Sequence, residues 1–153
     1  MKHLSFLILL INMTINAQQK NYFVHLTSDP MENPSSAIMS IAAATEALKQ
    51  GHSVTFFAAG DGTKILIKDV IRNLHTVTML GGSTKNISEN MENSLLFFSK
   101  NGGLIHISEG SISTFGVNKE NYKEHLIDVK DINWSYPKQL IEESSKADIV
   151  FSY

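Results

Sequence analysis

The sequence predicts one α/β domain in which helices cover both faces of a mainly parallel sheet. Short stretches rich in branched and aromatic residues, typical of strands, alternate with segments whose apolar residues recur at three- and four-residue spacing, typical of helices. This alternation predicts a parallel sheet, because helices connect its strands and pack on its faces. No internal repeat or linker divides the chain, and its length suits a single hydrophobic core.

Residues 1–17 are predicted to be a secretory signal peptide. Lys2 and His3 give a polar start, residues 4–11 are almost wholly apolar, and Ala17 is a small residue before a cleavage point. The alternative is a retained membrane anchor, which the apolar run disfavours because it is well short of the ~20 residues that span a bilayer. We expect residues 18–153 to form the domain of a periplasmic or secreted protein without membrane contact after signal removal.

The first half of the domain is predicted to hold two strands and three helices. Branched and aromatic residues mark the strands, whereas serine caps, periodic apolar residues and glycine stops mark the helices. Segments 59–63 and 75–87 are predicted to be mostly loop. The elements are, in order, a strand at 22–27, a helix capped by Ser35 or Ser36 and ending at Lys49, a strand at 53–58, a helix at 67–74 and a helix capped by Ser88.

The second half is predicted to hold three strands and three helices by the same criteria. Proline is favoured in the first turn of a helix, and asparagine and serine are favoured as caps. The elements are, in order, a strand at 104–107, a short helix from Ser108 to Gly116, a short helix at 119–126 capped by Asn118, a strand at 127–129, a helix opened by Ser135 and Pro137 and a strand at 148–153.

Charge and composition exclude several functions. The net charge is −2 and the charges are scattered, so the chain has no basic surface for nucleic acid or anionic lipid. The chain has no cysteine, which excludes disulfides, thiolate metal sites and thiol nucleophiles. The histidines lack the paired spacing of a metal site, and we expect neither a metal nor another cofactor.

The ends of the first three predicted strands carry the candidate binding site. Thr27 closes the first strand, Asp61 lies in the glycine-flanked loop after the second, and Ser108, Gly110 and Ser111 follow the third. In parallel sheets these ends share one edge, where α/β folds bind ligands, and hydroxyl and backbone N–H groups there can hold a small anion or a polar metabolite. Two structural alternatives stay open, because Ser108 can simply cap a helix and residues 60–62 can simply form a tight turn.

A catalytic Ser108 would need a histidine as its base. His25 and His106 lie in predicted strands that can be neighbours, but the glycine-x-serine-x-glycine elbow is absent. Each histidine is instead expected to be hydrogen-bonded in the core. Trp134 and Tyr136 precede the last predicted helix and suit a pocket wall, a subunit contact or ordinary packing.

Five passages together resemble the DsrE/DsrF-like family of small sulfur-relay proteins, from about Tyr22 to Tyr153. Each passage alone is a weak match to the family. They are Val24-His25-Leu26-Thr27-Ser28 with its proline-containing loop, the helix, Gly51-His52 and strand from 46 to 57, Gly60-Asp61-Gly62, the short segment from Gly110 to Gly116, and the closing helix and strand at 135–153.

The resemblance implies a three-layer α/β/α fold with a five-stranded, mainly parallel sheet, assembled as a homo-oligomer, often a trimer or hexamer. Active members carry a persulfide on a cysteine at about the position of Ser108, and a serine hydroxyl cannot hold that sulfur. We therefore expect a non-catalytic protein that binds a small ligand or a partner. The alternatives are an enzyme of unknown reaction using Ser108 and a purely structural homo-oligomer.

Overall fold

Five parallel strands form the centre of the protein in the computed structural model, which describes residues 18–75 and 84–153. The order across the sheet is β4-β3-β2-β1-β5, and every neighbouring pair is parallel. The predictions for residues 1–17, and for most of the loop at 75–87, lie outside the described residues. The strands are β1 (Asn21–Leu26), β2 (Ser53–Ala58), β3 (Leu104–Ser108), β4 (Ile132–Ser135) and β5 (Ile149–Ser152).

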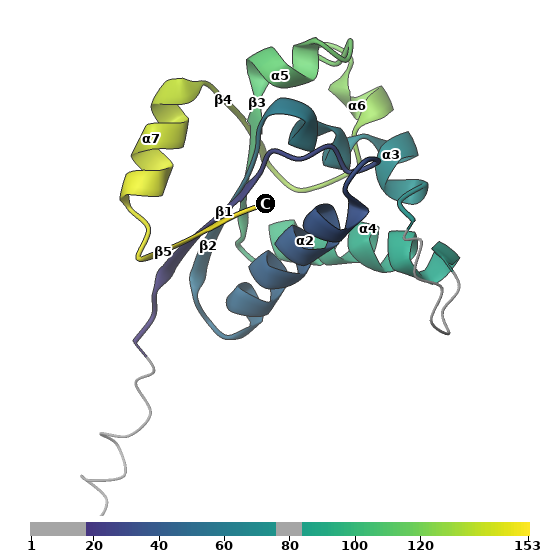
Figure 1. Ribbon diagram of the computed structural model, residues 1–153. Helices are drawn as coiled ribbons and strands as arrows, with labels where there is room; N and C mark the ends of the chain where they lie inside the picture. The colour runs from purple at the N-terminus through teal and green to yellow at the C-terminus, as the bar shows by residue number, and fades with distance from the viewer. Residues whose placement is uncertain (1–17, 76–83) are drawn as a thin grey trace, which may run out of the picture.

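Helices lie on both faces of this sheet, which confirms the three-layer fold (Figure 1). On one face, α2 (Pro34–Lys49) and α4 (Thr84–Lys100) pack beside each other, with the short α3 (Lys68–Arg72) next to α4. The opposite face carries α7 (Pro137–Ser145), a nine-residue helix with no buried residue. The two faces are therefore covered unequally.

The main core lies between the sheet and α2 with α4. Alternate strand residues such as Val24, Phe56 and Ile105 are fully buried there, because successive side chains of a strand point to opposite faces. Alanine makes the sheet-facing side of α2 slim, and Ala37 and Ala44 are both buried. Close packing of this kind fixes the positions of the strand ends.

The face under α7 carries a row of aromatic rings across three neighbouring strands. His25 of β1 pairs in register with Phe57 of β2, which pairs with His106 of β3. The Phe57 ring stacks on His106 with centroids 5.6 Å apart and meets His25 edge-on at 5.9 Å. The sequence left open whether the strands of His25 and His106 are neighbours, and the structure shows that they are not, because β2 lies between them.

Three helix boundaries differ from the predictions. The Asn33 side chain accepts a hydrogen bond from the Ser36 N–H at 3.2 Å, so Asn33 caps α2 instead of Ser35 or Ser36. Helix α4 begins at Thr84, before the predicted cap at Ser88. Asn118 does accept backbone hydrogen bonds at the start of a short turn, but helix α6 covers only Tyr122–His125.

The predicted fourth strand at 127–129 is wrong, since β4 is Ile132–Ser135. The apolar residues that suggested a strand are buried in a loop, where the Ile127 N–H donates to the Leu66 carbonyl at 2.9 Å. Asp131 then turns the chain with a positive φ of 53° before the strand begins. No helix in the described part of the chain is long and apolar enough to cross a membrane.

Candidate functional site

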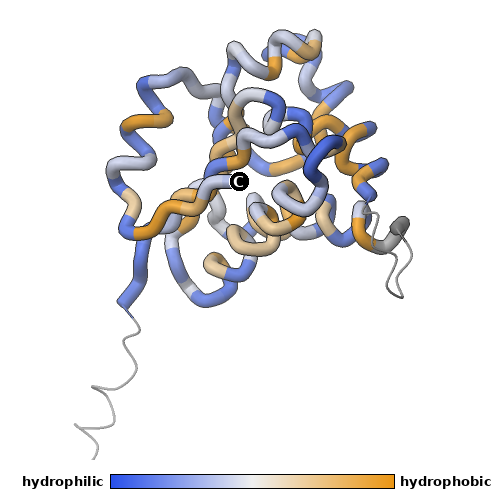
Figure 2. Tube along the Cα trace, viewed as in Figure 1, coloured by the Kyte–Doolittle hydropathy of each residue, from blue (hydrophilic) through white to orange (hydrophobic). Residues whose placement is uncertain are grey.

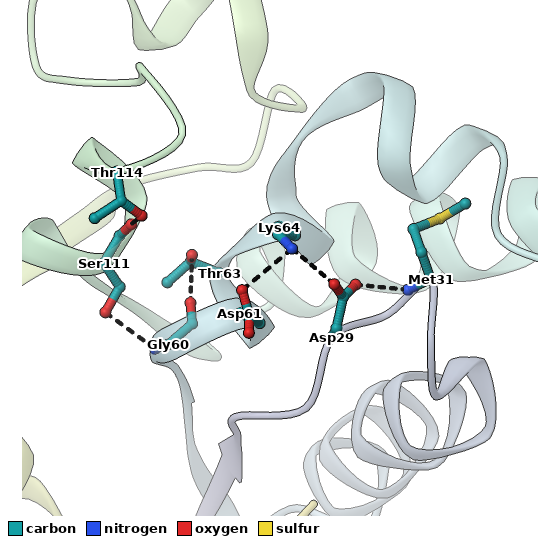
Figure 3. A network of polar contacts seen from close by, with 8 residues as sticks. All are labelled: Asp29, Met31, Gly60, Asp61, Thr63, Lys64, Ser111 and Thr114. Carbon is teal, nitrogen blue, oxygen red and sulfur yellow. Dashed lines mark hydrogen bonds and ion pairs between the residues drawn. The ribbon is translucent and has the colours of Figure 1, made fainter.

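Three connections meet at the carboxyl edge of the sheet. The loop after β1 carries Asp29, the 3-10 helix η1 (Gly60–Leu66) follows β2, and helix α5 (Glu109–Ser113) follows β3. Figure 3 shows that side chains join the three connections into one polar network. The segment after β2 was predicted to be a loop, and its 3-10 turns place Gly60 beside Ser111 and Lys64 beside Asp29.

Ser108 and Ser111 form a chain of hydrogen bonds with Gly60. The Gly60 N–H donates to Ser111 Oγ at 3.0 Å, and the Ser111 hydroxyl donates to Ser108 Oγ at 2.9 Å. Ser108 Oγ also accepts from the Ser111 N–H at 3.4 Å, so Ser108 caps α5 and the capping alternative is confirmed. The structure thus brings two predicted site residues into contact, together with a glycine of the loop that carries Asp61.

Two hydroxyl groups at the end of helix α5 donate to carbonyls of the helix itself. The Ser113 hydroxyl donates to the Glu109 carbonyl and the Thr114 hydroxyl donates to the Ser111 carbonyl, each at 2.7 Å. Gly110, another predicted site residue, borders open space, since a Cβ built on it meets nothing within 4 Å outside its own helix backbone. Gly110 therefore leaves open space beside the Ser108 hydroxyl turn without taking part in its hydrogen bonds.

A lysine links the first two connections. Lys64 Nζ lies 2.7 Å from Asp29 Oδ2 and 3.1 Å from Asp61 Oδ1 (Figure 3). The same atom lies 4.6 Å from the centre of the Phe115 ring. Burial raises the pKa of Asp29, but hydrogen bonds from Lys64 and the Met31 N–H outweigh it, and the pKa lies below its ordinary value. Asp61 is one of the predicted site residues and Asp29 is not, although the position of Asp29 just after a strand was a usable signal.

Thr27 takes a structural role at the same edge. Its hydroxyl donates to the Tyr153 carbonyl at 3.2 Å, which ties the end of β1 to the chain after β5. Its own carbonyl accepts from the Gly62 N–H at 3.1 Å. Gly62 must be glycine because a Cβ there would overlap the Leu26 carbonyl. The turn at 60–62 is therefore tightly packed against β1, as the structural alternative for this loop proposed.

A second ion pair involves Glu109, the residue that follows Ser108. Lys119 Nζ is 2.6 Å from Glu109 Oε2, and its hydrogen bond lowers the pKa of Glu109. Tyr136 also reaches this carboxylate, which raises the pKa of the tyrosine. Trp134 lies in β4 and packs edge-on against Tyr122 at 5.7 Å, so ordinary packing explains it. Tyr136 remains 53% exposed.

Neither strand histidine contacts Ser108. His106 Nδ1 lies 2.9 Å from the Oγ of the buried Ser135, which confirms the core hydrogen bond expected of this histidine. His25 differs from that expectation, because its Nε2 is buried without a hydrogen-bond partner among the described residues. Burial lowers the pKa of both imidazoles. The arrangement gives Ser108 no base for nucleophilic chemistry within the described residues.

A half-open cavity of about 700 Å³ lies at the opposite, amino edge of the sheet. Its wall includes His52, Asn101, Glu143 and Lys146, and none of the five predicted site residues belongs to it. Within residues 18–75 and 84–153, no three histidine, aspartate or glutamate side chains gather where they could hold a metal ion.

Comparisons with known proteins agree with this architecture. The model of the DsrE/DsrF-like family matches residues 20–153, which is most of the chain. Among solved structures, the crystal structure of the ychN protein from E. coli is similar, with a TM-score of 0.62 and 16% identity. The similarity covers 89% of this chain and 100% of that one, and at this identity it shows the fold alone. No curated protein matches the sequence. The extent of the family match shows that the chain belongs to the DsrE/DsrF-like family.

Proposed function

We propose that this protein is a non-catalytic member of its family that binds a small polar ligand at the Ser108 turn. The hydroxyl chain at that turn carries the proposal. Hydrogen bonds run in one direction, from the Gly60 N–H to Ser111 and from the Ser111 hydroxyl to Ser108. Among the described residues the Ser108 hydroxyl has no acceptor of its own, so it is the last donor of the chain and is available to a ligand. Consecutive hydrogen bonds polarise one another, which strengthens that donor.

The surrounding charges favour an uncharged ligand with a hydrogen-bond acceptor over an anion. Two lysines flank the turn, and each is already paired: Lys64 with Asp29 and Asp61, and Lys119 with Glu109. Three carboxylates against two ammonium groups leave no unpaired positive charge there. A carbonyl or hydroxyl oxygen of a small metabolite suits the Ser108 donor better than a sulfur oxyanion does.

A thermal-shift screen of the purified protein tests this function. Neutral metabolites, sulfur oxyanions and simple anions would be compared on the wild type and on the Ser108→Ala variant. A ligand that binds the folded state raises the unfolding midpoint. We expect a neutral acceptor to do so for the wild type and not for Ser108→Ala.

The control variant is Ser113→Ala, which removes a hydroxyl from the same helix that bonds only to the Glu109 carbonyl. It should respond to ligand as the wild type does. A ligand that stabilises Ser108→Ala as strongly as the wild type would place the binding site elsewhere. The absence of any ligand-dependent shift would favour the structural role.

We also propose that the protein is exported through residues 1–17, on the strength of their signal-peptide composition. Expression of the full chain in a bacterium with an outer membrane, followed by fractionation and N-terminal sequencing, tests this. We expect a periplasmic protein that begins at or near Gln18, and a cytoplasmic protein when residues 2–17 are deleted. An intact leader on cytoplasmic protein would contradict export.

A further inference from the structure

Strand β5 forms one edge of the sheet and is apolar on both faces. Its four residues, Ile149–Ser152, pair only with β1 among the described strands, so the backbone groups along its other side have no strand partner. Val150 is 54% exposed on the face of α7, and Phe151 is 39% exposed on the face of α2. Figure 2 shows the apolar colour running along this strand.

The opposite edge of the sheet is built differently. Strand β4 carries Asn133 and Ser135, follows the charged pair Lys130 and Asp131, and leads directly into Pro137. Charges, an irregular backbone and proline are devices that keep an edge strand from pairing with another chain. The residues Ile149-Val150-Phe151-Ser152 of β5 include no charge, no proline is near them in the sequence, and the charge that adjoins the strand is the single Asp148.

We propose that β5 pairs with β5 of a second copy of this chain, in antiparallel orientation about a two-fold axis perpendicular to the sheet. Such an axis keeps the α7 faces of both copies on the same side, so directly opposed residues must come from the same face. Only two registers of this short strand meet that condition while keeping its apolar residues paired. In one register Val150 opposes its own counterpart, and in the other Phe151 does.

The charges next to β5 favour its own copy as the occupant. Asp148 is the only charged residue adjoining the strand, and it opposes Ser152 in the first register and lies beyond the paired residues in the second. No like-charged side chains of the described residues therefore face each other in either register. The Asp148 carboxylate already accepts from the Asn21 N–H at 2.8 Å, so it is not free for a basic partner. A partner recognised by charge would find nothing to bind along this edge.

Single cysteines test the pairing directly, because the chain contains no other thiol. Opposed Cα atoms of antiparallel strands lie about 4.5–5.5 Å apart, which is within the span of a disulfide. Under mild oxidation we expect a covalent dimer from either Val150→Cys or Phe151→Cys, and the reactive variant identifies the register. Leu104→Cys is the matched control: Leu104 is 49% exposed and lies in the same cross-strand row as Val150, separated from it by Phe23 and Thr55.

Sedimentation of the purified protein gives the second readout. We expect an even number of subunits for the wild type, at least a twofold loss of mass for Val150→Lys, and no loss for Leu104→Lys. Circular dichroism would show that each variant is folded, which is expected because both side chains are about half exposed. A monomeric wild type, a trimer without cross-links at either β5 position, or dissociation by Leu104→Lys alone would overturn the proposal.

This inference is independent of ligand binding at Ser108. The β5 edge could dimerise in a protein whose Ser108 turn binds nothing, and a monomer could still bind a ligand there. The cross-linking experiment can therefore contradict the β5 pairing without affecting the proposed ligand site, and the thermal-shift experiment can contradict the ligand site without affecting the pairing.

Discussion

The Oγ atom of Ser111 lies 2.9 Å from the Oγ of Ser108 and 3.0 Å from the backbone nitrogen of Gly60. One hydroxyl thereby joins the connection after β3 to the connection after β2. The Lys64 ion pairs extend the same linkage to the loop after β1. At the carboxyl edge, the loops are consequently held together by side chains that reach from one loop to another. Each of the first three predictions changes one part of this edge.

Removal of the Ser111 hydroxyl should destabilise the protein. Ser111→Ala leaves the Gly60 N–H without its acceptor and Ser108 without its donor, and the loss of a hydrogen bond that is at least partly exposed costs about 0.5–1.5 kcal/mol. Urea denaturation would measure the free energy of unfolding. Ser113→Ala, whose hydroxyl bonds to one carbonyl of its own helix, should cost less. Equal losses in the two variants would show that the link to Gly60 contributes nothing.

Two glycine substitutions should have opposite effects on stability. In Gly62→Ala the new methyl group overlaps the Leu26 carbonyl. The backbone must shift to make room, and overpacking of this kind lowers the free energy of unfolding by about 1–3 kcal/mol. In Gly110→Ala the methyl group enters open space within a helix, which should stabilise the protein by about 0.5–1 kcal/mol. The unfolding midpoints of both variants would be compared with the wild type. A tolerated Gly62→Ala would contradict the close approach of η1 to β1.

A thiol at the turn should carry sulfur where the wild type cannot. After incubation with a polysulfide donor, intact-mass spectrometry should show no stable adduct on the wild type and the mass of an added sulfur on Ser108→Cys. Ser113→Cys is the control for position. The thiol of Ser108→Cys receives hydrogen bonds from the Ser111 hydroxyl and N–H, so its pKa should be the lower of the two and its alkylation at neutral pH the faster. A sulfane adduct on the wild type would refute the loss of sulfur chemistry.

Stability should fall as the pH drops below about 6.5. Burial lowers the pKa of His25 and His106 in the folded protein from 6.5, so the unfolded chain binds protons first. The stabilising contribution is therefore complete above pH 6.5 and decreases as the pH falls through the lower folded pKa values. Urea denaturation at several pH values between 7.5 and 5 would measure this decrease in the free energy of unfolding.

A second loss of stability, due to Asp29, should occur at lower pH. The pKa of this carboxyl is also lowered in the folded protein, and its ordinary value is 3.8. Its stabilising contribution is present above that value and is lost as the pH falls further. A His106→Gln variant should flatten part of the decline between pH 6.5 and 5 while leaving the decline below pH 4 unchanged. An unaltered upper decline would show that His106 titrates normally.

Local patterns predicted most of the fold. Strand β2 is Ser53–Ala58 as the branched and aromatic run indicated, and α2 ends at Lys49 before the glycine stop. The prediction of the fourth strand failed because Ile127 and Val129 are apolar for another reason, burial in a loop, whereas the four-residue strand β4 contains Asn133, a poor strand former. Burial and strand pairing give similar local signals, and only the tertiary structure separates them.

The site was predicted only in part, because its local contacts are visible in the sequence and its long-range contacts are not. The capping of α5 by Ser108 follows from a serine at a strand-to-helix boundary and is visible in the sequence. The contact between Asp29 and Lys64 joins residues that are 35 positions apart, and no local spacing encodes it. Strand order is equally hidden, which is why Phe57 was not expected between His25 and His106.

Trp134 is the only tryptophan of the chain. Its ring lies 5.9 Å from the Lys119 ammonium group, which is paired with the glutamate next to Ser108. Indole emission responds to nearby charge and to water, so any event that disturbs this ion pair should change the fluorescence of a single, known position. The protein therefore carries its own optical reporter for this end of the sheet, and binding can be followed in solution without a label.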